Sequence, residues 1–407
     1  MNETTKATAN NLPEKPLTGV RVLDLTHAYS GPFCTMHLAD QGAEVIKIEA
    51  PGKGDQSRGW APFQNGASGY YAYINRNKYG LSLDLKAPEG KAIFRSLVKT
   101  ADVLVENFRV GTMEKLGLGY DVLKEINPGL IYASVSGFGL EGPLAKQPCY
   151  DIIAQAMGGL MSVTGFDRFT KVGTAIADNY SGTYLSLGIV MALYQRSVTG
   201  AGRRVDVSML DTIFSILETG VTDYTIGGKV NGPVGNRDPG IAPFDSFEAR
   251  DGAFVIACGT DSFWRILCDI MERPDLKEDP RFLTNSQRVA CYVDTLKPIV
   301  QEWAGRQKLD DVERWMQEAG IPFGRILHMD EVCALEPIRD RHMLWEIEDP
   351  EIGEKIRIPG TPIKMRGCAD EPQRPAPRLG EHTETILRGS LSLTDEELVE
   401  LREKHVI

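Results

Sequence analysis

The stretch GVRVLDLTHAYSGPFCTMHLADQGAEVIKIE, residues 19–49, decides the fold class. Residues 19–28 form a mostly apolar run that predicts a buried strand. Residues 34–49 predict a helix, a Gly-Ala turn and a second strand. A strand, a helix and a strand in this order are typical of a βαβ unit, in which the two strands run parallel.

The same alternation continues downstream. The pattern predicts a helix at 90–101, a strand at 102–108, helical segments at 110–118 and 120–127, and a strand at 130–139. A strongly apolar helix follows at 181–196, and residues 205–224 predict a strand, a turn and another long helix. Strands separated by helices of this length favour an α/β fold with a doubly wound, Rossmann-like parallel sheet.

A segment rich in glycine and proline, residues 226–240, interrupts this pattern and marks a domain boundary. Residues 244–259 then predict a β-hairpin with an Asp-Gly turn, which opens a smaller α+β domain. We therefore expect four parts: a flexible leader at 1–15, a large α/β domain at 16–225, a small α+β domain at 226–335, and a return segment at 336–407 that completes the large domain.

Composition disfavours several classes of protein. The 407 residues carry a formal net charge of −11, which disfavours nucleic acid as the main partner. No apolar run approaches the ~20 residues of a membrane helix, and no signal peptide is recognisable, so we expect a soluble, cytoplasmic protein without a membrane partner. Seven scattered cysteines and six widely spaced histidines argue against a disulfide framework and against a metal site.

Asp151 is the only charged residue in QPCYDIIAQAMGGLMSVTG, residues 147–165. It stands at the head of a predicted short helix, at or near the N-cap. The apolar positions of that helix recur at helical spacing and would bury one face: Ile152, Ile153, Ala156, Met157 and Leu160. An aspartate in such a place is most often only a cap that accepts bonds from the first free amides. Its surroundings must supply the reason to consider it a nucleophile.

A literal G-x-G-x-x-G occurs at Gly137, Gly139 and Gly142. A dinucleotide fingerprint must open a helix, whereas Pro143 and Pro148 interrupt the chain here, so the context argues against nucleotide binding of that kind. P-loop, His-Glu-x-x-His, Gly-x-Ser-x-Gly and EF-hand patterns are absent from the sequence. Phosphoryl transfer, metal hydrolysis and serine hydrolysis therefore lose support.

Five cations lie in polar, glycine-rich segments that follow predicted strands: Lys53, Arg58, Arg76, Lys78 and Arg109. Doubly wound sheets bind ligands at the carboxyl ends of their strands. Each cation alone is most simply a solvated surface charge. Five in one class of loop are candidates to hold a polyphosphate.

Many further motifs occur together and in a fixed order. They are THAYSGPF (26–33), GAEVIKIE (42–49), GDQSR (54–58), NRNK (75–78), ADVLVENFRVGTMEKLGLGY (101–120), INPGLIYASVSGFG (126–139) and YDIIAQAMGGLMSVTG (150–165). In this combination the chain resembles the family III CoA-transferases, from about Pro16 to the C-terminus. The resemblance implies a large Rossmann-like domain and a smaller α+β domain in an interlocked homodimer.

The finer resemblance is to the acetyl-CoA:oxalate and formyl-CoA:oxalate CoA-transferases. It is carried by GTMEKLG (111–117), GNRDPGIAPFDSF (235–247) and GTPIKMRGCAD (360–370). The succinyl-CoA:glutarate branch shares much of the same text, including NRNK and the PRLGEHTETIL tail.

The resemblance also implies roles for single positions. Asp151 takes the place of the family's nucleophilic aspartate and is the one predicted catalytic residue. The predicted CoA-binding residues are His27, Ala28, Tyr29, Ser30, Arg58, Lys78, Asn107, Phe108, Arg109, Gly111, Met113, Gly137, Phe138 and Gly139. Ala50 stands where some relatives carry an arginine for the CoA phosphates, so Arg58, Lys78 or Arg109 is expected to supply that charge.

Residues 235–243 take the place of a glycine-rich loop that covers the reacting anhydride in the formyl-CoA:oxalate enzymes. This chain lacks consecutive glycines there. A covering loop is a chemical requirement as well, since an anhydride or thioester open to water would hydrolyse. Bulky side chains at Trp60, Tyr70, Tyr71 and Tyr73 either close the pocket or belong to the core.

The implied reaction moves CoA from acetyl-, formyl- or succinyl-CoA to a small acid, with oxalate expected as acceptor. A carboxylate can carry CoA between two acids because it forms mixed anhydrides and a thioester in turn. CoA and acyl-CoA are expected as substrates, without a tightly bound cofactor. Three alternatives stay open: a glutarate-like acceptor, a 2-methylacyl-CoA racemase, which needs two proton-transfer groups across one carbon, and a CoA-binding protein without activity.

Overall fold

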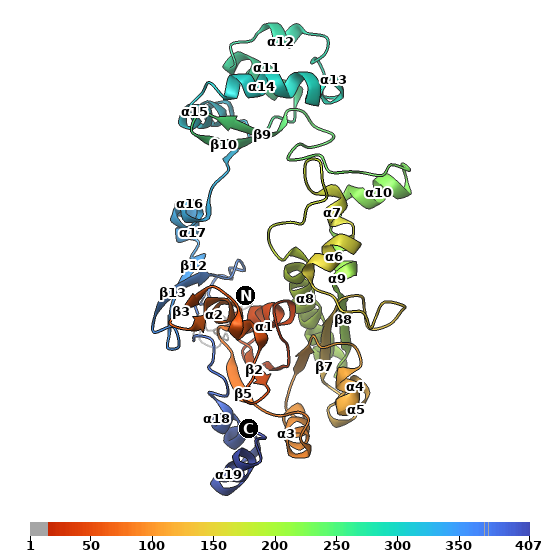
Figure 1. Cartoon of the computed structure of the whole chain (residues 1–407), viewed down its shortest axis with the longest axis vertical. Coiled ribbons are helices and arrows are strands. Elements are labelled where there is room, and N and C mark those ends of the chain that lie inside the picture. The colour runs from red at the N-terminus through yellow and green to blue at the C-terminus, as the bar shows by residue number, and fades with distance from the viewer. Residues whose placement is uncertain (1–14, 370, 373) are drawn as a thin grey trace, which may run out of the picture. The chain divides into compact units, whose positions relative to one another are not determined.

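A computed structural model describes residues 15–369, 371–372 and 374–407. The predicted leader, apart from Lys15, lies outside the described residues. Lys15 itself is buried, and its Nζ donates to the carbonyl oxygen of Asp40 at 3.0 Å. The chain divides into two compact units, which are described separately (Figure 1). Among the described residues, the first contains 15–160, 172–221 and 336–407 apart from 370 and 373, and the second contains 161–171 and 222–335.

The first unit is built on a six-stranded sheet in the order β5-β2-β1-β6-β7-β8. Its strands are β1 (Arg21–Asp24), β2 (Glu44–Glu49), β5 (Tyr79–Ser82), β6 (Val103–Glu106), β7 (Ile131–Ser136) and β8 (Arg204–Ser208). All neighbouring strands pair in parallel, which confirms the predicted α/β class. The strand order reverses between β1 and β6, and such a switch point opens a crevice at the carboxyl ends of the strands.

Successive side chains of a strand point to opposite faces of the sheet, and apolar side chains lie on both faces. Helices therefore cover both faces. On β1, Leu23 packs on one face and Val22 on the other. One face is covered by α3 (Pro88–Val98), α5 (Tyr120–Ile126), α18 (Thr383–Leu391) and α19 (Asp395–Glu403). The other is covered by α1 (Ser30–Asp40), α8 (Ile176–Thr199) and α9 (Met209–Ser215), with α1 and α8 side by side (Figure 1). The C-terminal helices thus complete the core of the first unit.

Shorter elements decorate this sheet. They are η1 (Gln56–Gly59), β3 (Phe63–Gln64), β4 (Ala67–Ser68), α2 (Gly69–Asn75), α4 (Thr112–Leu116), α6 (Asp151–Met157), α17 (Glu336–Asp340), β12 (Leu344–Asp349) and β13 (Glu354–Pro359). The chain passes between the two units at four places: within α7 (Leu160–Val163), between residues 171 and 172, within α10 (Thr219–Thr225), and between residues 335 and 336. No helix in the described ranges is long and apolar enough to cross a bilayer.

The second unit has an antiparallel sheet in the order β11-β10-β9, with the predicted hairpin at its edge. Its strands are β9 (Phe244–Ala249), β10 (Gly252–Ala257) and β11 (Phe323–Arg325). Its helices are α11 (Asp261–Ile270), α12 (Asp275–Glu278), α13 (Asn285–Ala290), the π-helical turn η2 (Tyr292–Leu296), α14 (Lys297–Ala304), α15 (Leu309–Ala319) and α16 (Met329–Ala334). A separate apolar core, which includes Trp264 and Phe254, holds it together.

Several features differ from the sequence prediction, among them strand β5, where no strand was predicted. Residues 161–171 belong to the second unit, because Gly165 accepts a backbone hydrogen bond from Gly235 at 2.8 Å. The single long helix expected after β8 is two short helices, α9 and α10, separated by a turn in which Glu218 has a φ of 49°. Helix α8 begins at Ile176, five positions before the predicted start at Ser181.

Candidate active site

A cavity of about 340 Å³ lies where β1, β6 and β7 end, at the switch point of the parallel sheet. Eight of the predicted CoA-binding residues line it: His27, Ala28, Tyr29, Ser30, Asn107, Phe108, Arg109 and Gly137. Further lining residues that the sequence analysis did not single out include Gln56, Lys146, Gln147, Tyr150 and Asp178. The strand order therefore brings together loops that lie far apart in the chain.

The loop after β1 is held by the loop after β6. The Asn107 side chain accepts a hydrogen bond from the backbone N–H of His27 and donates one to the carbonyl oxygen of His27, both at 2.8 Å. The His27 ring lies 5.0 Å from the Phe108 ring. Burial, together with the charge of Lys47, lowers the pKa of His27, so its imidazole is neutral at pH 7.

Glycine is required where the loop after β7 passes the segment that leads into α6. A Cβ on Gly137 would lie 2.2 Å from the Cβ of Cys149, so no larger residue fits without a shift. Gly139 and Gly111 have φ angles of 85° and 88°, which favour glycine. Gly111, Gly139, Phe138 and the buried Met113 do not line the cavity.

Three of the five predicted cations form ion pairs inside the first unit. The fully buried Lys78 lies 3.0 Å from Asp24. Arg76 pairs with Asp40 at 2.7 Å, also inside the protein. Burial lowers the pKa of Lys78 to about 8, even beside Asp24. The Lys78 and Arg76 side chains are thus inaccessible to a phosphate in this structure.

Arg58 has a structural role as well. Its guanidinium donates to Glu49 at 2.8 Å and to the hydroxyl of Tyr71 at 2.6 Å, and it lies over the Tyr71 ring at 3.8 Å. Lys53 and Arg109 are exposed, and Arg109 lines the cavity. Lys146, which is also exposed, adds a second cation to the lining.

Asp151 is the first residue of α6 and does not belong to the cavity lining. One of its carboxylate oxygens accepts from Gln155 Nε2 at 2.7 Å, and the other accepts from the backbone N–H of Ala177 at 2.8 Å. It therefore ties the start of α6 to the start of α8. This geometry matches a helix-capping role, although the helix that Asp151 caps is α8.

The predicted buried face of α6 is wrong for the single chain. Ile152, Ile153 and Met157 are 48%, 41% and 50% exposed. The buried residues are Ala154 and Gln155. Gln155 turns inward because its amide bonds to Asp151 and also accepts from the backbone N–H of Val172, so a polar network rather than the apolar stripe fixes the orientation of the helix.

Asp178, in the first turn of α8, is the carboxylate that lines the cavity. The Ser30 side chain lies beside it in the cavity wall. Burial, and then the negative charge of Asp151, raise the pKa of Asp178 to about 7. The sequence analysis missed Asp178 because it began this helix at Ser181. An acid in the first turn of a long apolar helix is the signal that was available.

Aromatic side chains line the cavity beside Asp178. The rings of Trp60 and Tyr70 lie 5.2 Å apart, and those of Tyr29 and Tyr70 lie 5.6 Å apart. Tyr73 is not in the cavity lining and packs against the small apolar cluster around Trp345. Tyr71 packs against Arg58 in the interior, so the four aromatic positions divide between cavity and core.

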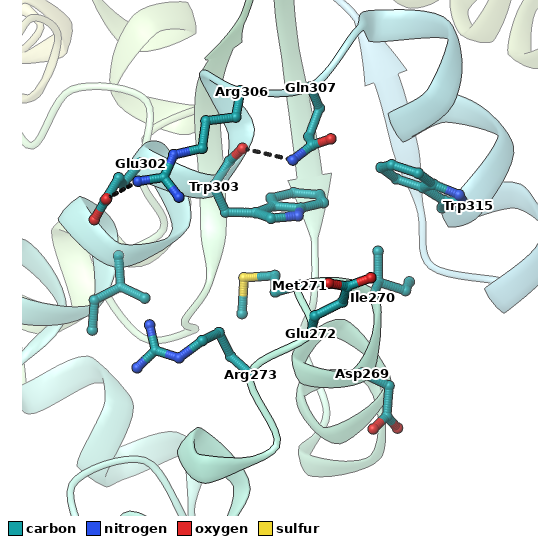
Figure 2. Close-up of a pocket in the computed structure, with 11 residues that line it drawn as sticks. Asp269, Ile270, Met271, Glu272, Arg273, Glu302, Trp303, Arg306, Gln307 and Trp315 are labelled. Carbon is teal, nitrogen blue, oxygen red and sulfur yellow. Dashed lines mark hydrogen bonds and ion pairs between the residues drawn. The ribbon is translucent and has the colours of Figure 1, made fainter.

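A second cavity, of about 460 Å³, lies within the second unit (Figure 2). Figure 2 shows Trp303 among the lining residues, together with Arg306 and Arg273. Both arginines are already paired, Arg306 with Glu302 and Arg273 with Asp275. We base the candidate site on the first cavity, since that cavity contains the predicted residues and a carboxylate of strongly raised pKa.

In residues 15–369, 371–372 and 374–407, no group of three His, Cys, Asp or Glu residues is arranged to hold a metal ion.

Comparison with known proteins agrees with this geometry. The family model for CoA-transferase family III matches residues 17–383. The acetyl-CoA:oxalate CoA-transferase of Acetobacter aceti is 42% identical over 385 residues, which cover 94% of this chain and 96% of that protein. The human succinyl-CoA:glutarate CoA-transferase is 35% identical, with 98% and 91% covered.

Solved structures give the same result. A CAIB/BAIF family protein from Brucella suis superposes with a TM-score of 0.83 at 36% identity, covering 92% of this chain and 99% of that one. The chain therefore belongs to CoA-transferase family III and is an enzyme of that class, which acts on CoA thioesters.

Proposed function

We propose that this enzyme transfers CoA from an acyl-CoA to a small carboxylic acid, with Asp178 as the nucleophile. The observation that carries the proposal is the contrast between the two aspartates. Asp178 lines the switch-point cavity, whereas both carboxylate oxygens of Asp151 are bonded to groups of the protein. A nucleophile needs an oxygen that can reach the substrate.

The proposed reaction has four steps. Asp178 attacks the donor thioester, which gives an aspartyl-acyl anhydride and CoA thiolate. The thiolate attacks the aspartyl carbonyl, which gives an aspartyl-CoA thioester and releases the donor acid. The acceptor carboxylate attacks that thioester and frees the thiolate again. The thiolate then attacks the acceptor's carbonyl in the second anhydride, forming the new acyl-CoA and restoring the Asp178 carboxylate.

The surroundings of Asp178 suit this chemistry. A carboxylate whose pKa is raised by burial is more basic, and less shielded by water, than one at the surface. It must be ionised to attack, so the rate should rise with pH through about 7. The neutral His27 ring offers no competing charge.

CoA itself would lie along the loops after β1, β6 and β7. Asn107, Phe108 and Arg109 line the cavity together, and Arg109 and Lys146 are the exposed cations in that lining. We leave Lys78 and Arg58 out of the phosphate site because their charges are neutralised inside the protein. Closure by residues 235–243 stays a prediction. These residues lie in the second unit.

We propose oxalate as the acceptor. Support comes from the relative that is named an acetyl-CoA:oxalate CoA-transferase, and from the bulky rings of Tyr29, Trp60 and Tyr70 in the same cavity lining as Asp178. The glutarate-specific relative supports the alternative of a longer dicarboxylate. Location in the cytoplasm stays a prediction from the sequence.

A homodimer is the proposed assembly. Helix α8 has a continuous stripe of exposed apolar side chains, at spacings of three and four residues: Tyr180, Tyr184, Leu187, Met191, Tyr194 and Val198. These are 40% to 75% exposed, and such a stripe on a helix is typical of a protein interface. Light scattering on the purified protein measures the number of chains directly.

The test is mass-detected CoA exchange. Acetyl-, formyl- and succinyl-CoA are each offered with oxalate, formate, succinate and glutarate as acceptors. Formation of oxalyl-CoA would support both transfer and the acceptor. Transfer to another acid only would overturn oxalate as acceptor, and no transfer to any acid would count against the proposed activity.

A further inference from the structure

A buried ion pair lies beneath the loop after β1. Lys47 Nζ and Asp55 Oδ2 are 2.9 Å apart, and both side chains are completely buried. Removing two charges from water costs several kcal/mol per ion, so a pair of this kind seldom serves stability alone. The contacts of the pair show which segment it organises.

Both members of the pair hold the backbone of the loop. Lys47 Nζ donates to the carbonyl oxygen of Thr26 at 3.0 Å. Asp55 Oδ1 accepts from the backbone N–H of Ala28 at 3.2 Å, and from the N–H and hydroxyl of Ser57 at 2.9 Å each. The pair thus holds the backbone on either side of His27 through hydrogen bonds. Asn107, in the loop after β6, makes hydrogen bonds to the backbone of His27 itself.

The segment that the pair holds, residues 26–28, is strained. Ala28 has a φ of 65°, a left-handed conformation that costs a residue with a Cβ roughly 1–2 kcal/mol. Such strain persists only where the surroundings over-determine the conformation, and it is found chiefly at functional sites. Here the bend at Ala28 turns the chain from β1 into α1, and it places Tyr29 and Ser30 in the cavity wall.

Both groups remain charged around neutral pH. Burial alone would raise the pKa of Asp55, but Lys47 holds that pKa well below its usual range. Burial alone would lower the pKa of Lys47, but Asp55, Asp24 and Glu49 raise it. The ion pair therefore stays charged, and continues to hold the loop, across the pH range in which Asp178 titrates.

We propose that Lys47 and Asp55 are positioning residues, which hold residues 26–30 so that the Ser30 hydroxyl meets the Asp178 carboxylate. This inference rests on the proposed function, because it assigns the loop to the support of the nucleophile. The connection runs from Asp55 through Ala28 to Ser30, and from Ser30 to Asp178.

The test compares Asp55→Ala with Asp40→Ala. Asp40 also belongs to a fully buried ion pair, with Arg76 at 2.7 Å, but it lies in the last turn of α1, roughly 15 Å from the loop by the helical rise. The two variants thus lose comparable buried charge pairs. Asp55→Asn is the milder variant, since its Oδ1 can still accept from Ala28.

Asp55→Ala is expected to lower kcat by about 10- to 100-fold, the effect of a misplaced catalytic group. The rising limb of its pH profile should move to higher pH, because the Ser30 side chain, where it lies beside Asp178, lowers the pKa of that carboxyl. Amide hydrogen exchange should accelerate in the peptide that contains residues 26–30. Asp40→Ala should leave the pH profile and the exchange of this peptide as in the wild type.

An unchanged pH profile and unchanged exchange at residues 26–30 in folded Asp55→Ala protein would overturn the inference. Equal changes in Asp40→Ala would also overturn it, because the effect would then be general destabilisation. If the wild type transfers no CoA, the proposed function fails instead. The exchange measurement still decides whether the pair holds the loop.

Discussion

Replacement of Asp151 by asparagine distinguishes the two candidate nucleophiles. If Asp178 attacks the thioester, Asp151→Asn should remain active, and the rising limb of its pH profile should move to lower pH. The reason is electrostatic: Asp151 contributes to the raised pKa of Asp178, second only to burial. Asparagine keeps an oxygen that can accept from the Ala177 N–H, so α8 keeps its cap.

The size of the shift follows from the geometry. Asp151 bonds to the amide immediately before Asp178, so we take their carboxylates to be about 6 Å apart. Two unit charges at that distance repel by roughly 0.7 kcal/mol in water and by roughly 3 kcal/mol at an effective dielectric constant of about 20. Removal of one charge should lower the apparent pKa by about half a unit to two units.

The assay is the initial rate of CoA exchange at saturating acyl-CoA, measured across the neutral pH range. Asp178→Asn serves as the inactive control, and CoA binding by calorimetry shows that each variant retains its site. An Asp151→Asn protein that binds CoA but transfers none, beside an active Asp178→Asn protein, would refute the assignment. An unshifted profile would refute the electrostatic argument alone.

Trypsin offers an independent readout of the nucleophile. Cleavage after Lys146 and Arg168 yields a peptide with Asp151, and cleavage after Lys171 and Arg196 yields a peptide with Asp178. Incubation with acyl-CoA followed by rapid digestion should place the CoA adduct on residues 172–196. An adduct confined to residues 147–168 would identify Asp151 instead.

Other substitutions test the remaining assignments. Lys78→Met should lower the free energy of unfolding in urea by about 3–5 kcal/mol, because Asp24 loses its buried partner, and should leave CoA affinity unchanged in folded protein. Arg109→Ala should raise KM for acyl-CoA by about tenfold or more without loss of stability, as expected for a charge-assisted contact with phosphate. Because the pKa of Asp178 is raised in the folded state, this group should add to the wild-type free energy of unfolding at low pH. The contribution is fully present below the unfolded pKa of the group and is lost as pH rises through about 7. Urea titrations at several pH values should show that Asp178→Asn lacks this contribution.

Local pattern predicted five of the six strands of the main sheet, and β5 (Tyr79–Ser82) was not predicted. The apolar runs that became β1, β2, β6 and β7 are short and bounded, and each precedes a polar loop. The parallel class followed from the helices between them. Strand order did not follow, because nothing within a strand states which neighbour it will pair with. The break between α9 and α10 was not predicted either, because the backbone bend at Glu218 depends on its surroundings in the fold.

The sequence predicted which loops form the site, but it predicted the roles of single residues in those loops less well. Asp151 is conspicuous in sequence because its neighbours are uncharged, yet its bonding partner Ala177 lies 26 positions away. Lys78 looks like a loop cation until its partner Asp24, 54 positions away, is known. Burial and pairing of a charge are tertiary properties, so residue type and spacing cannot distinguish a ligand-binding group from one half of an internal pair.

The environment of Asp178 bears on the covalent intermediates as well as on the nucleophile. A pKa raised from 3.8 to about 7 corresponds to roughly 4 kcal/mol by which the site disfavours the ionised carboxylate. Formation of the anhydride or the thioester removes that charge, and with it the cost of burial and the repulsion from Asp151. Burial and the charge of Asp151, which raise the pKa of Asp178, therefore also favour the acylated states once attack has occurred.

It follows that Asp151→Asn, although active, should accumulate less aspartyl-CoA thioester at equilibrium than the wild type. In the variant, the free Asp178 carboxylate is no longer repelled by a charge at position 151. Mass measurement of the intact protein with acyl-CoA quantifies that fraction, and an equal or greater fraction in the variant would show that Asp151 does not act on Asp178 through its charge.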